Sequence, residues 1–557
     1  MIRSFFALVL ICLGSASWSA EPVYGGDLNV GTVYVTLSPL SWDPADWTWK
    51  SNHDHGGARE QLFAGDLTKS KRNGGPYAFI ADAYLPTESM RGELAEHWYW
   101  EDRLTLVIKL RQGVMFPTKP GVMEARELIA DDVVYSYDLV NESPKRIPTY
   151  FDHINKIEAR DDHTVVFHLN HFNAEWPYRF GYGYYSGISP REMSQIDRKS
   201  WKNVTGTGPF QLERYVQANA QMYRKNEQYW DQITLNQQNY PLPFVDRVNY
   251  RIIKDEATYL TALRTGQLDI LEAIRWIAVD HLKETTPELK WNRWLATGGQ
   301  FISLRVDQKP FDDLRVRRAL NLAVNQQEIV DHFYGGHAEL MAYPQHPEFG
   351  EYFEPLEAMP DAVQELFTYD PEEARRLLDE AGVPEGFSFD LQVCSCSPSH
   401  MDLVPLLESY FSKVGLKTNI KPMEYASFLS AMTTKTHGPA YFLSSGHVNP
   451  MTTIRKSFVT GQTWNPSQYS DPDFDEQVRI LHLTRDEGER IETLRNLTRE
   501  ILEQAPYVWL PIPYNHTAWW PWVKNYGGVI RAGSVFPLPI SAPIWNLQKL
   551  EKRMGGD

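Results

Sequence analysis

The fold is decided by the stretch that reads Gly92-Glu-Leu-Ala-Glu-His-Trp-Tyr-Trp-Glu-Asp102, then Leu106-Val-Ile-Lys-Leu-Arg-Gln-Gly-Val-Met-Phe116, then Ala130-Asp-Asp-Val-Val-Tyr-Ser-Tyr137. Residues 104–111 have the pattern of a strand, which a turn region rich in Gly and Pro follows. The acids Asp131 and Asp132 suit the first turn of a helix, because carboxylates complement the amide groups exposed there. A strand, a turn region and a helix in this order predict a mixed α/β fold.

The alternation of strand and helix continues outward in both directions. We expect strands over 25–35 and 248–253, and a further strand that starts at Leu268. Helices that end at glycines are expected over 256–265, 314–333 and 371–381. The chain contains no internal repeat and no flexible Gly/Ser linker, so ordered crossings should join its domains.

Four further segments follow the opening stretch in a fixed order. They read Gly206-Thr-Gly-Pro-Phe-Gln-Leu, Arg224-Lys-Asn-Glu-Gln-Tyr-Trp, Ala262-Leu-Arg-Thr-Gly-Gln-Leu-Asp-Ile and Pro310-Phe-Asp-Asp-Leu-Arg-Val-Arg-Arg-Ala-Leu. Each segment has a structural reading; the glycines Gly206 and Gly208, for example, would permit a tight turn before Pro209. Taken together, the segments resemble those of the family 5 solute-binding proteins, the peptide, nickel and oligosaccharide receptors of bacterial ABC importers.

This resemblance implies an α/β, two-lobed periplasmic binding protein fold of the large three-domain type, hinged by two crossings. We expect the first lobe, domain I, to comprise residues 21–65, 195–290 and 513–557. An inserted smaller domain, domain II, should span 66–194, and the second lobe, domain III, should span 291–512. A fold of this kind predicts that the lobes close around a solute.

The first twenty residues have the features of a signal peptide. Arg3 precedes an apolar run over 5–13, and small residues follow over 14–20. The run is shorter than the roughly 20 apolar residues that a membrane span needs. We therefore predict export to the periplasm, with cleavage near Ser19; a lipid anchor on Cys12 is the alternative, although Ile11 is bulkier than the residue that such processing prefers.

Net charge, the absence of catalytic motifs and the cysteine content limit which partners and reactions are possible for this protein. The net charge of −16 argues against nucleic acid, because Lys and Arg hold the phosphate backbone. No Gly-x-Ser-x-Gly, Walker, His-Glu-x-x-His or dinucleotide motif is present, so we predict no catalytic residue and no enzyme activity. Beyond the leader, Cys394 and Cys396 are the remaining thiols; they form either a local disulfide or two buried thiols, and neither form implies catalysis.

The candidate solute contacts come from the resemblance, which assigns them to the loops 52–57 and 444–451. Peptide receptors of the family usually carry an Asp four residues before the proline of the second loop, and this chain has Gly446 there. A buried ammonium group without a counter-charge is costly, so this departure weakens the case for a peptide with a free N-terminus. The candidate ligand-binding residues are Asp54, His55, Trp47, Trp49, Gly446, His447, Asn449, Arg455 and Trp464.

Each candidate also has an ordinary structural interpretation. The aromatic residues Trp47, Trp49 and Trp464 could stack on a solute or simply pack, and Arg455 could pair with a carboxylate or lie in solvent. His53, Asp54 and His55 could ligate a metal, but adjacent residues do not converge on one ion, so we predict neither a metal site nor a cofactor.

The sequence thus predicts the periplasmic receptor of an ABC importer, a monomer that captures a peptide or peptide-like solute and delivers it to the permease subunits. An oligosaccharide or an opine-like small molecule is the alternative solute. A secreted hydrolase and a structural envelope protein are the alternatives from other classes, and the absence of a catalytic motif argues against the first of these.

Overall fold

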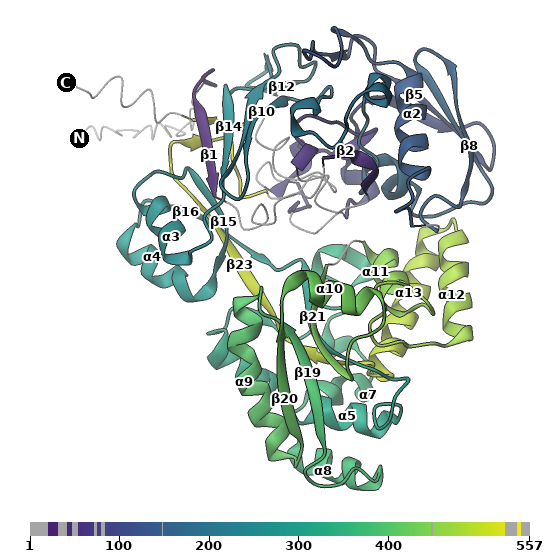
Figure 1. The fold of residues 1–557 in the computed structure, drawn as a ribbon, viewed down its shortest axis with the longest axis vertical. Helices are drawn as coiled ribbons and strands as arrows, with labels where there is room; N and C mark the ends of the chain where they lie inside the picture. The colour runs from purple at the N-terminus through teal and green to yellow at the C-terminus, as the bar shows by residue number, and fades with distance from the viewer. Residues whose placement is uncertain are drawn as a thin grey trace, which may run out of the picture.

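The computed structural model describes residues 21–31, 42–46, 54–71, 75–79, 84–147, 149–446, 449–529 and 543–546. Within these ranges the protein is a mixed α/β structure of two lobes, with the inserted domain beside the first lobe (Figure 1). The predicted signal peptide, residues 1–20, lies outside the described residues. The α/β, two-lobed prediction is confirmed.

The sheet of the first lobe joins segments that are far apart in sequence. Its β1 strand pairs in parallel with two other strands, so that Val30 lies opposite both Tyr250 and Ile270. Helices α3 (Glu256–Arg264) and α4 (Val279–Thr285) accompany this sheet. In spatial order its strands are β10 (Phe210–Val216), β11 (Ala220–Lys225), β14 (Arg247–Arg251), β1 (Asp27–Gly31), β15 (Ile270–Arg275), β23 (Ile512–Trp519) and β16 (Lys290–Leu295), with β18 (Ala338–Glu339) paired to β23.

The inserted domain is an antiparallel sheet covered by a helix. Its strands, in spatial order, are β4 (Ala95–Trp100), β5 (Thr105–Leu110), β9 (Thr164–Leu169) and β8 (Ile154–Asp161). Helix α2 (Ala130–Asn141) starts as predicted, because the Asp132 carboxylate accepts a hydrogen bond of 3.0 Å from the amide of Ile129. The strand and the helix expected from the opening stretch are therefore confirmed.

The second lobe has a mixed sheet flanked by helices. Its strands, in spatial order, are β20 (Lys417–Met423), β19 (Ser388–Cys394), β21 (Ala440–Gly446), β17 (Gly298–Leu304) and β22 (Tyr507–Leu510). The helices of this lobe include α5 (Leu314–Leu322), α8 (Pro371–Glu380), α9 (Pro398–Lys413), α11 (Pro450–Phe458), α12 (Pro472–Leu483) and α13 (Glu487–Glu503).

The chain passes between the two lobes at two neighbouring places. One crossing joins β16 to β17 between Leu295 and Gly298, and the other joins β22 to β23 between Leu510 and Ile512. Residues 291–295, which the prediction assigned to the second lobe, pair with β23 inside the sheet of the first lobe. The two crossings therefore form a hinge that begins after Leu295.

One predicted helix is wrong, and the two predicted glycine positions are right. The single helix expected over 314–333 ends at Leu322, because the side chain of Asn325 caps a new helical start by accepting from the amide of Glu328. The need for glycine at positions 206 and 208 is confirmed, because a Cβ at Gly206 would lie 2.2 Å from the carbonyl oxygen of Ala58 and one at Gly208 would lie 2.5 Å from that of Gly57.

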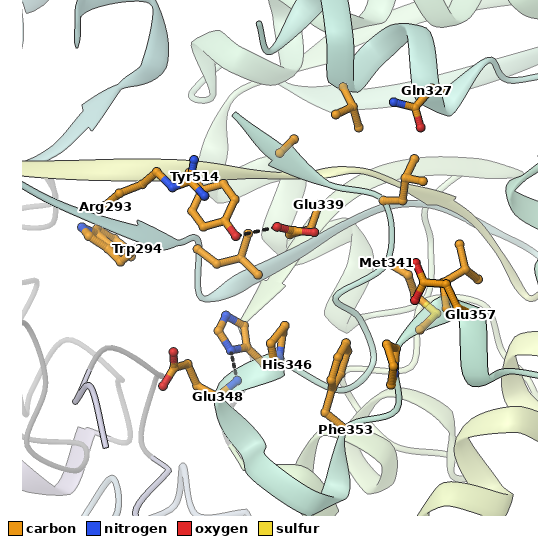
Figure 2. Close-up of a pocket in the computed structure, with 17 residues that line it drawn as sticks. Arg293, Trp294, Gln327, Glu339, Met341, His346, Glu348, Phe353, Glu357 and Tyr514 are labelled. Atoms are coloured by element: carbon orange, nitrogen blue, oxygen red, sulfur yellow. Dashed lines mark hydrogen bonds between the residues drawn. The ribbon is translucent and has the colours of Figure 1, made fainter. Parts of the chain in front are cut away.

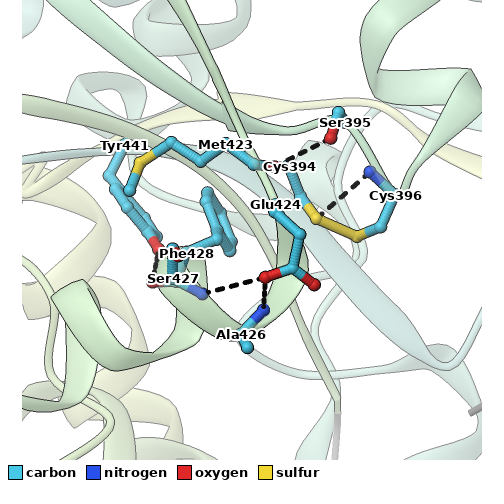
Figure 3. The surroundings of a disulfide bond; sticks show 9 residues. All are labelled: Cys394, Ser395, Cys396, Met423, Glu424, Ala426, Ser427, Phe428 and Tyr441. Atoms are coloured by element: carbon cyan, nitrogen blue, oxygen red, sulfur yellow. Dashed lines mark hydrogen bonds between the residues drawn. A yellow bond between two sulfur atoms is a disulfide. The ribbon is translucent and has the colours of Figure 1, made fainter.

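Cys394 and Cys396 form a disulfide, the first of the two alternatives that the sequence left open (Figure 3). The bond lies at the carboxyl end of β19. Between the two cysteines, the amide and the hydroxyl of Ser395 both donate to the carbonyl oxygen of Met423, at 2.9 and 3.0 Å. The loop is therefore fixed to the end of the neighbouring strand β20.

Within the part of the chain that the structure describes, no helix has the length and apolar character that crossing a membrane requires.

Candidate functional site

The two lobes touch on the side away from the hinge. Figure 1 places α11 and α12 of the second lobe directly beneath the inserted domain, while β15, β16 and β23 lie on the opposite side. The inserted domain contributes residues 172–179, including the start of a π-helical segment, η6 (Pro177–Tyr182). This contact surface, which we call the seam, closes the far side of the space between the lobes.

Glu175 is the charged centre of the seam. Its carboxylate is 2.6 Å from Nη2 of Arg179 and 3.2 Å from Nε2 of His482, and it accepts a hydrogen bond from the hydroxyl of Thr452. Burial alone would raise the pKa of Glu175, but the charges of Arg179 and His482 hold that pKa well below its ordinary value. Thr452 and His482 belong to the second lobe, so the carboxylate is shared between the lobes.

Arg455, a predicted candidate, lies in the same region. Burial and then the like charge of Arg179 lower the pKa of Arg455 to about 10, although Glu175 opposes the shift. Its Nη1 donates to the side-chain oxygen of Gln462 at 3.3 Å. Arg455 therefore faces the seam between the lobes, and its contact with a solute stays a prediction.

Gly446 and Asn449 flank the loop that resemblance assigned to the solute. Gly446 pairs with Gly298 at the end of β21, and Asn449 caps α11 by accepting from the amide of Thr452 at 2.8 Å. The ammonium group of Lys456 donates to the carbonyl oxygen of Gly446 at 2.5 Å and to the hydroxyl of Ser445 at 3.1 Å. This strand end therefore carries a cation that the sequence analysis missed.

The candidates from the first loop lie in the other lobe. The carboxylate of Asp54 accepts from Nε2 of Gln221 at 2.9 Å, and the ring of His55 stacks on Trp42 at 5.5 Å. Both residues are buried, and β11, which carries Gln221, holds this loop in place. Trp464 packs against the core of the second lobe, whereas Trp47, Trp49 and His447 lie outside the described residues.

A cavity of about 540 Å³ lies beside the hinge (Figure 2). Its wall includes Arg293 of β16, Tyr514 of β23 and Glu339 of β18. The Tyr514 hydroxyl donates to Glu339 at 2.5 Å, and the guanidinium carbon of Arg293 is 3.8 Å from the centre of the Tyr514 ring. These three groups contact one another, and the wall also carries the side chains of Glu348 and Glu357.

Sequence reasoning missed the seam residues Glu175, Arg179, Thr452 and His482. The spacing of Glu175 and Arg179 is that of an ion pair on one helix face, which was the available signal. Nothing in the sequence indicated that this face would meet α11 and α12. Among the described residues, no group of three or more His, Cys, Asp and Glu side chains is placed to hold a metal ion.

Comparisons with known proteins agree with this architecture. The di/tripeptide-binding protein 1 of Pseudomonas aeruginosa is 28% identical over 498 residues, which cover 84% of this chain and 86% of the relative. The periplasmic binding protein DppA from Helicobacter pylori, solved with the peptide STSA, gives a TM-score of 0.75 at 23% identity over 94% of this chain and 98% of its own. MoaA from A. tumefacien R10, solved with mannopinic acid, gives a TM-score of 0.73 at 20% identity over 93% and 98% of the two chains.

The two solved structures share the fold at identities that say nothing about the solute. The sequence match to a family carries more weight: the family described as bacterial extracellular solute-binding proteins, family 5 Middle, matches residues 89–466. This range contains the opening stretch, the inserted domain beyond it and most of the second lobe. The chain belongs to the bacterial extracellular solute-binding proteins of family 5.

Proposed function

We propose that this protein is the periplasmic receptor of an ABC importer, which captures a peptide or peptide-like solute by hinge closure and delivers it to the permease subunits. The observation that carries this proposal is the pair of adjacent crossings, one after Leu295 and one after Leu510, between two separate α/β sheets. Two neighbouring connections permit rotation of one lobe against the other and resist most other movements.

The finer parts of the proposal rest on the sequence. The leader over 1–20 would direct the chain to the periplasm, and the receptor would act as a monomer without enzyme activity or cofactor. The domain division is proposed as predicted, with the first crossing placed after Leu295. The solute would lie between the loops that carry Asp54 and Gly446, and the other candidate contacts stay as predicted from the sequence.

A second solute class is favoured by Lys456. Its ammonium group already donates to the carbonyl oxygen of Gly446, and the ammonium of a bound peptide at this strand end would be repelled by it. A solute that presents an anionic or neutral group there avoids this repulsion. An opine-like conjugate, in which the amino group of an amino acid is substituted, is therefore the second candidate.

Isothermal titration tests the proposal directly. The panel consists of dipeptides, oligosaccharides, opine-like amino-acid conjugates and nickel, and product formation is followed by mass spectrometry. We expect one-to-one binding of a single class without chemical change. Turnover of a compound would contradict the receptor function, and so would the absence of binding across the panel when the native protein also carries no co-purified solute.

The variant Gly446→Asp separates the two solute classes. An added carboxylate at this strand end would repel an anionic group of a bound solute and attract an ammonium group, so a receptor for opine-like conjugates should lose affinity for them and gain affinity for dipeptides with a free N-terminus. A receptor for ordinary dipeptides should gain little. Gly446→Asn, which adds a side chain of the same size without the charge, is the control for a general disturbance of this strand end.

A further inference from the structure

The seam contains contacts that exist only while the lobes touch. Glu175 and Arg179 come from the inserted domain, whereas Thr452 and His482 come from α11 and α12 of the second lobe. Glu175 is 3% exposed and Arg179 is 1% exposed. If the lobes separated, Glu175 would keep Arg179, four residues away on its own segment, but it would lose both partners from the second lobe.

The orientation of His482 is fixed by its own helix. Its Nδ1 is 2.7 Å from the carbonyl oxygen of Val478, and a carbonyl oxygen can only accept, so Nδ1 is the donor. The opposite nitrogen, Nε2, is thereby directed at Glu175, 3.2 Å away, and it donates to the carboxylate when the ring is protonated. The second lobe thus presents a preformed set of groups, a hydroxyl and an imidazole, to the carboxylate of the inserted domain.

Backbone and cation–π contacts extend the same contact surface. The amide of Ala174 donates to the carbonyl oxygen of His482 at 2.8 Å. The guanidinium carbon of Arg485 is 3.9 Å from the ring centre of Phe172 and 5.4 Å from that of Trp100. The contacts therefore surround the buried ion pair of Glu175 and Arg179. Burying two charges costs free energy, and removing one partner costs more, because the other charge is then left buried without a counter-charge.

We infer that Glu175, Arg179, Thr452 and His482 form a clasp that holds the two lobes closed and so sets the affinity for solute. This inference rests on the proposed function for its effect on affinity, but not for its effect on closure. Apparent affinity falls in proportion to the fraction of molecules in the binding-competent closed form. Residues that touch no solute can therefore control its release.

The first measurement needs no solute. Small-angle X-ray scattering gives the radius of gyration of the solute-free protein, and hydrogen exchange gives the protection of the Ala174 amide, which bonds across the seam. We expect Glu175→Gln to increase the radius of gyration and to speed exchange at Ala174 about tenfold or more, because opening exposes this amide. Thr452→Val should act in the same direction with a smaller effect, and it leaves the buried charges paired.

Asp132→Asn is the matched control. Asp132 is also a buried carboxylate of the inserted domain, and it pairs with Arg126 at 2.6 Å within that domain. Its loss should lower the melting temperature but leave the radius of gyration and the exchange at Ala174 unchanged. If Glu175→Gln fails to fold, Thr452→Val and His482→Gln still decide the question.

The second measurement is the affinity for the dipeptide Met-Leu and for any other panel compound that binds the wild-type protein. We expect Kd to rise about tenfold in Glu175→Gln and about threefold in Thr452→Val, and to stay unchanged in Asp132→Asn. Wild-type scattering and exchange in both seam variants would overturn the clasp, and so would equal opening in the control. Failure of every compound to bind the wild-type protein would overturn the proposed function and leave the scattering result standing.

Discussion

The two lobes are joined in two places that differ in kind. At the hinge, the chain itself crosses, and β16 pairs with β23 along its whole length from Lys290 to Leu295. At the seam, no covalent link exists among the described residues, and side chains such as Glu175 and Thr452 make the connection. The hinge therefore persists in every folded conformation, whereas the seam exists only in the closed one.

Because of this difference, substitutions at the hinge and at the seam should affect different properties, the stability of the fold and the closure of the lobes. A substitution at the hinge removes packing that the open and closed forms share. It should therefore lower the free energy of unfolding without changing the equilibrium between the open and closed forms. A substitution at the seam removes contacts that only the closed form has. It should therefore change the equilibrium between the open and closed forms more than it changes the free energy of unfolding. The predictions below test this division, from the largest expected effect to the smallest.

Trp294→Ala should be the most destabilising change. Trp294 lies on β16, is 1% exposed, and donates from Nε1 to the hydroxyl of Thr517 on β23 at 3.1 Å. Removing a buried aromatic side chain of this size costs about 3–5 kcal/mol, which urea denaturation will measure. Ile277→Ala, at a position that is 71% exposed, should change the free energy of unfolding by less than about 0.5 kcal/mol. A cost below about 1 kcal/mol for Trp294→Ala would contradict the structural role of the hinge strands.

His400 should make the second lobe sensitive to acid. Its ring stacks on Phe442 at 4.2 Å, and burial lowers the pKa of His400 from 6.5 to about 4. As the pH falls, His400 therefore takes up a proton in the unfolded chain before it does so in the folded protein. The contribution of His400 to the free energy of unfolding is fully present above pH 6.5 and is lost as the pH falls towards 4. The loss amounts to about 3 kcal/mol at most.

The variant His400→Leu should reduce this slope, and denaturation at several pH values will measure it; His516, whose pKa burial also lowers to about 4, accounts for part of the slope that remains. Glu175 should stay ionised over the same range, because its pKa lies below its ordinary value. The radius of gyration of the folded protein should therefore not change between pH 6.5 and 5. Opening in this window would show that the seam, and not the core of the second lobe, is the acid-sensitive part.

Arg485→Ala should weaken the edge of the seam. Arg485 is exposed and lies over the rings of Phe172 and Trp100, and such contacts contribute about 0.5–1 kcal/mol. We expect a smaller increase in the radius of gyration than in Glu175→Gln. An effect equal to that of Glu175→Gln would mean that the buried ion pair is not the centre of the clasp.

Asp402→Asn should have the smallest effect. Asp402, on α9, is 3.1 Å from Arg275 on β15, so this ion pair joins the lobes on the hinge side, but Asp402 is largely exposed. Exposed pairs contribute about 0–1 kcal/mol, since water screens them. The melting temperature and the radius of gyration should both remain close to those of the wild-type protein. A clear opening in this variant would remove the distinction between the two sides of the molecule.

The sequence by itself determined the elements whose signals are local. The helix that begins at Glu256 was predicted within one residue, because the Asp255 side chain caps its first turn and Gly266 takes the left-handed backbone, φ +68°, that ends it. The helix at Pro371 has the same pair of signals in Asp370 and Gly382. The opening stretch identified the α/β family for the same reason, since its strands and helix are specified by neighbours in the chain.

Only the tertiary structure determined which residues meet at the seam and which charged group lies next to Gly446. Thr452 meets Glu175 across 277 residues of sequence, and no local pattern encodes which surfaces of two lobes will touch. Lys456, on α11, contacts Gly446 at the end of β21. The break in the helix expected over 314–333 depends on a side-chain cap at Asn325. Helix caps and hydrophobic periodicity are local, so they determine where individual helices and strands form. The contacts between the lobes depend on burial and charge between residues far apart in the sequence, which local propensity does not encode.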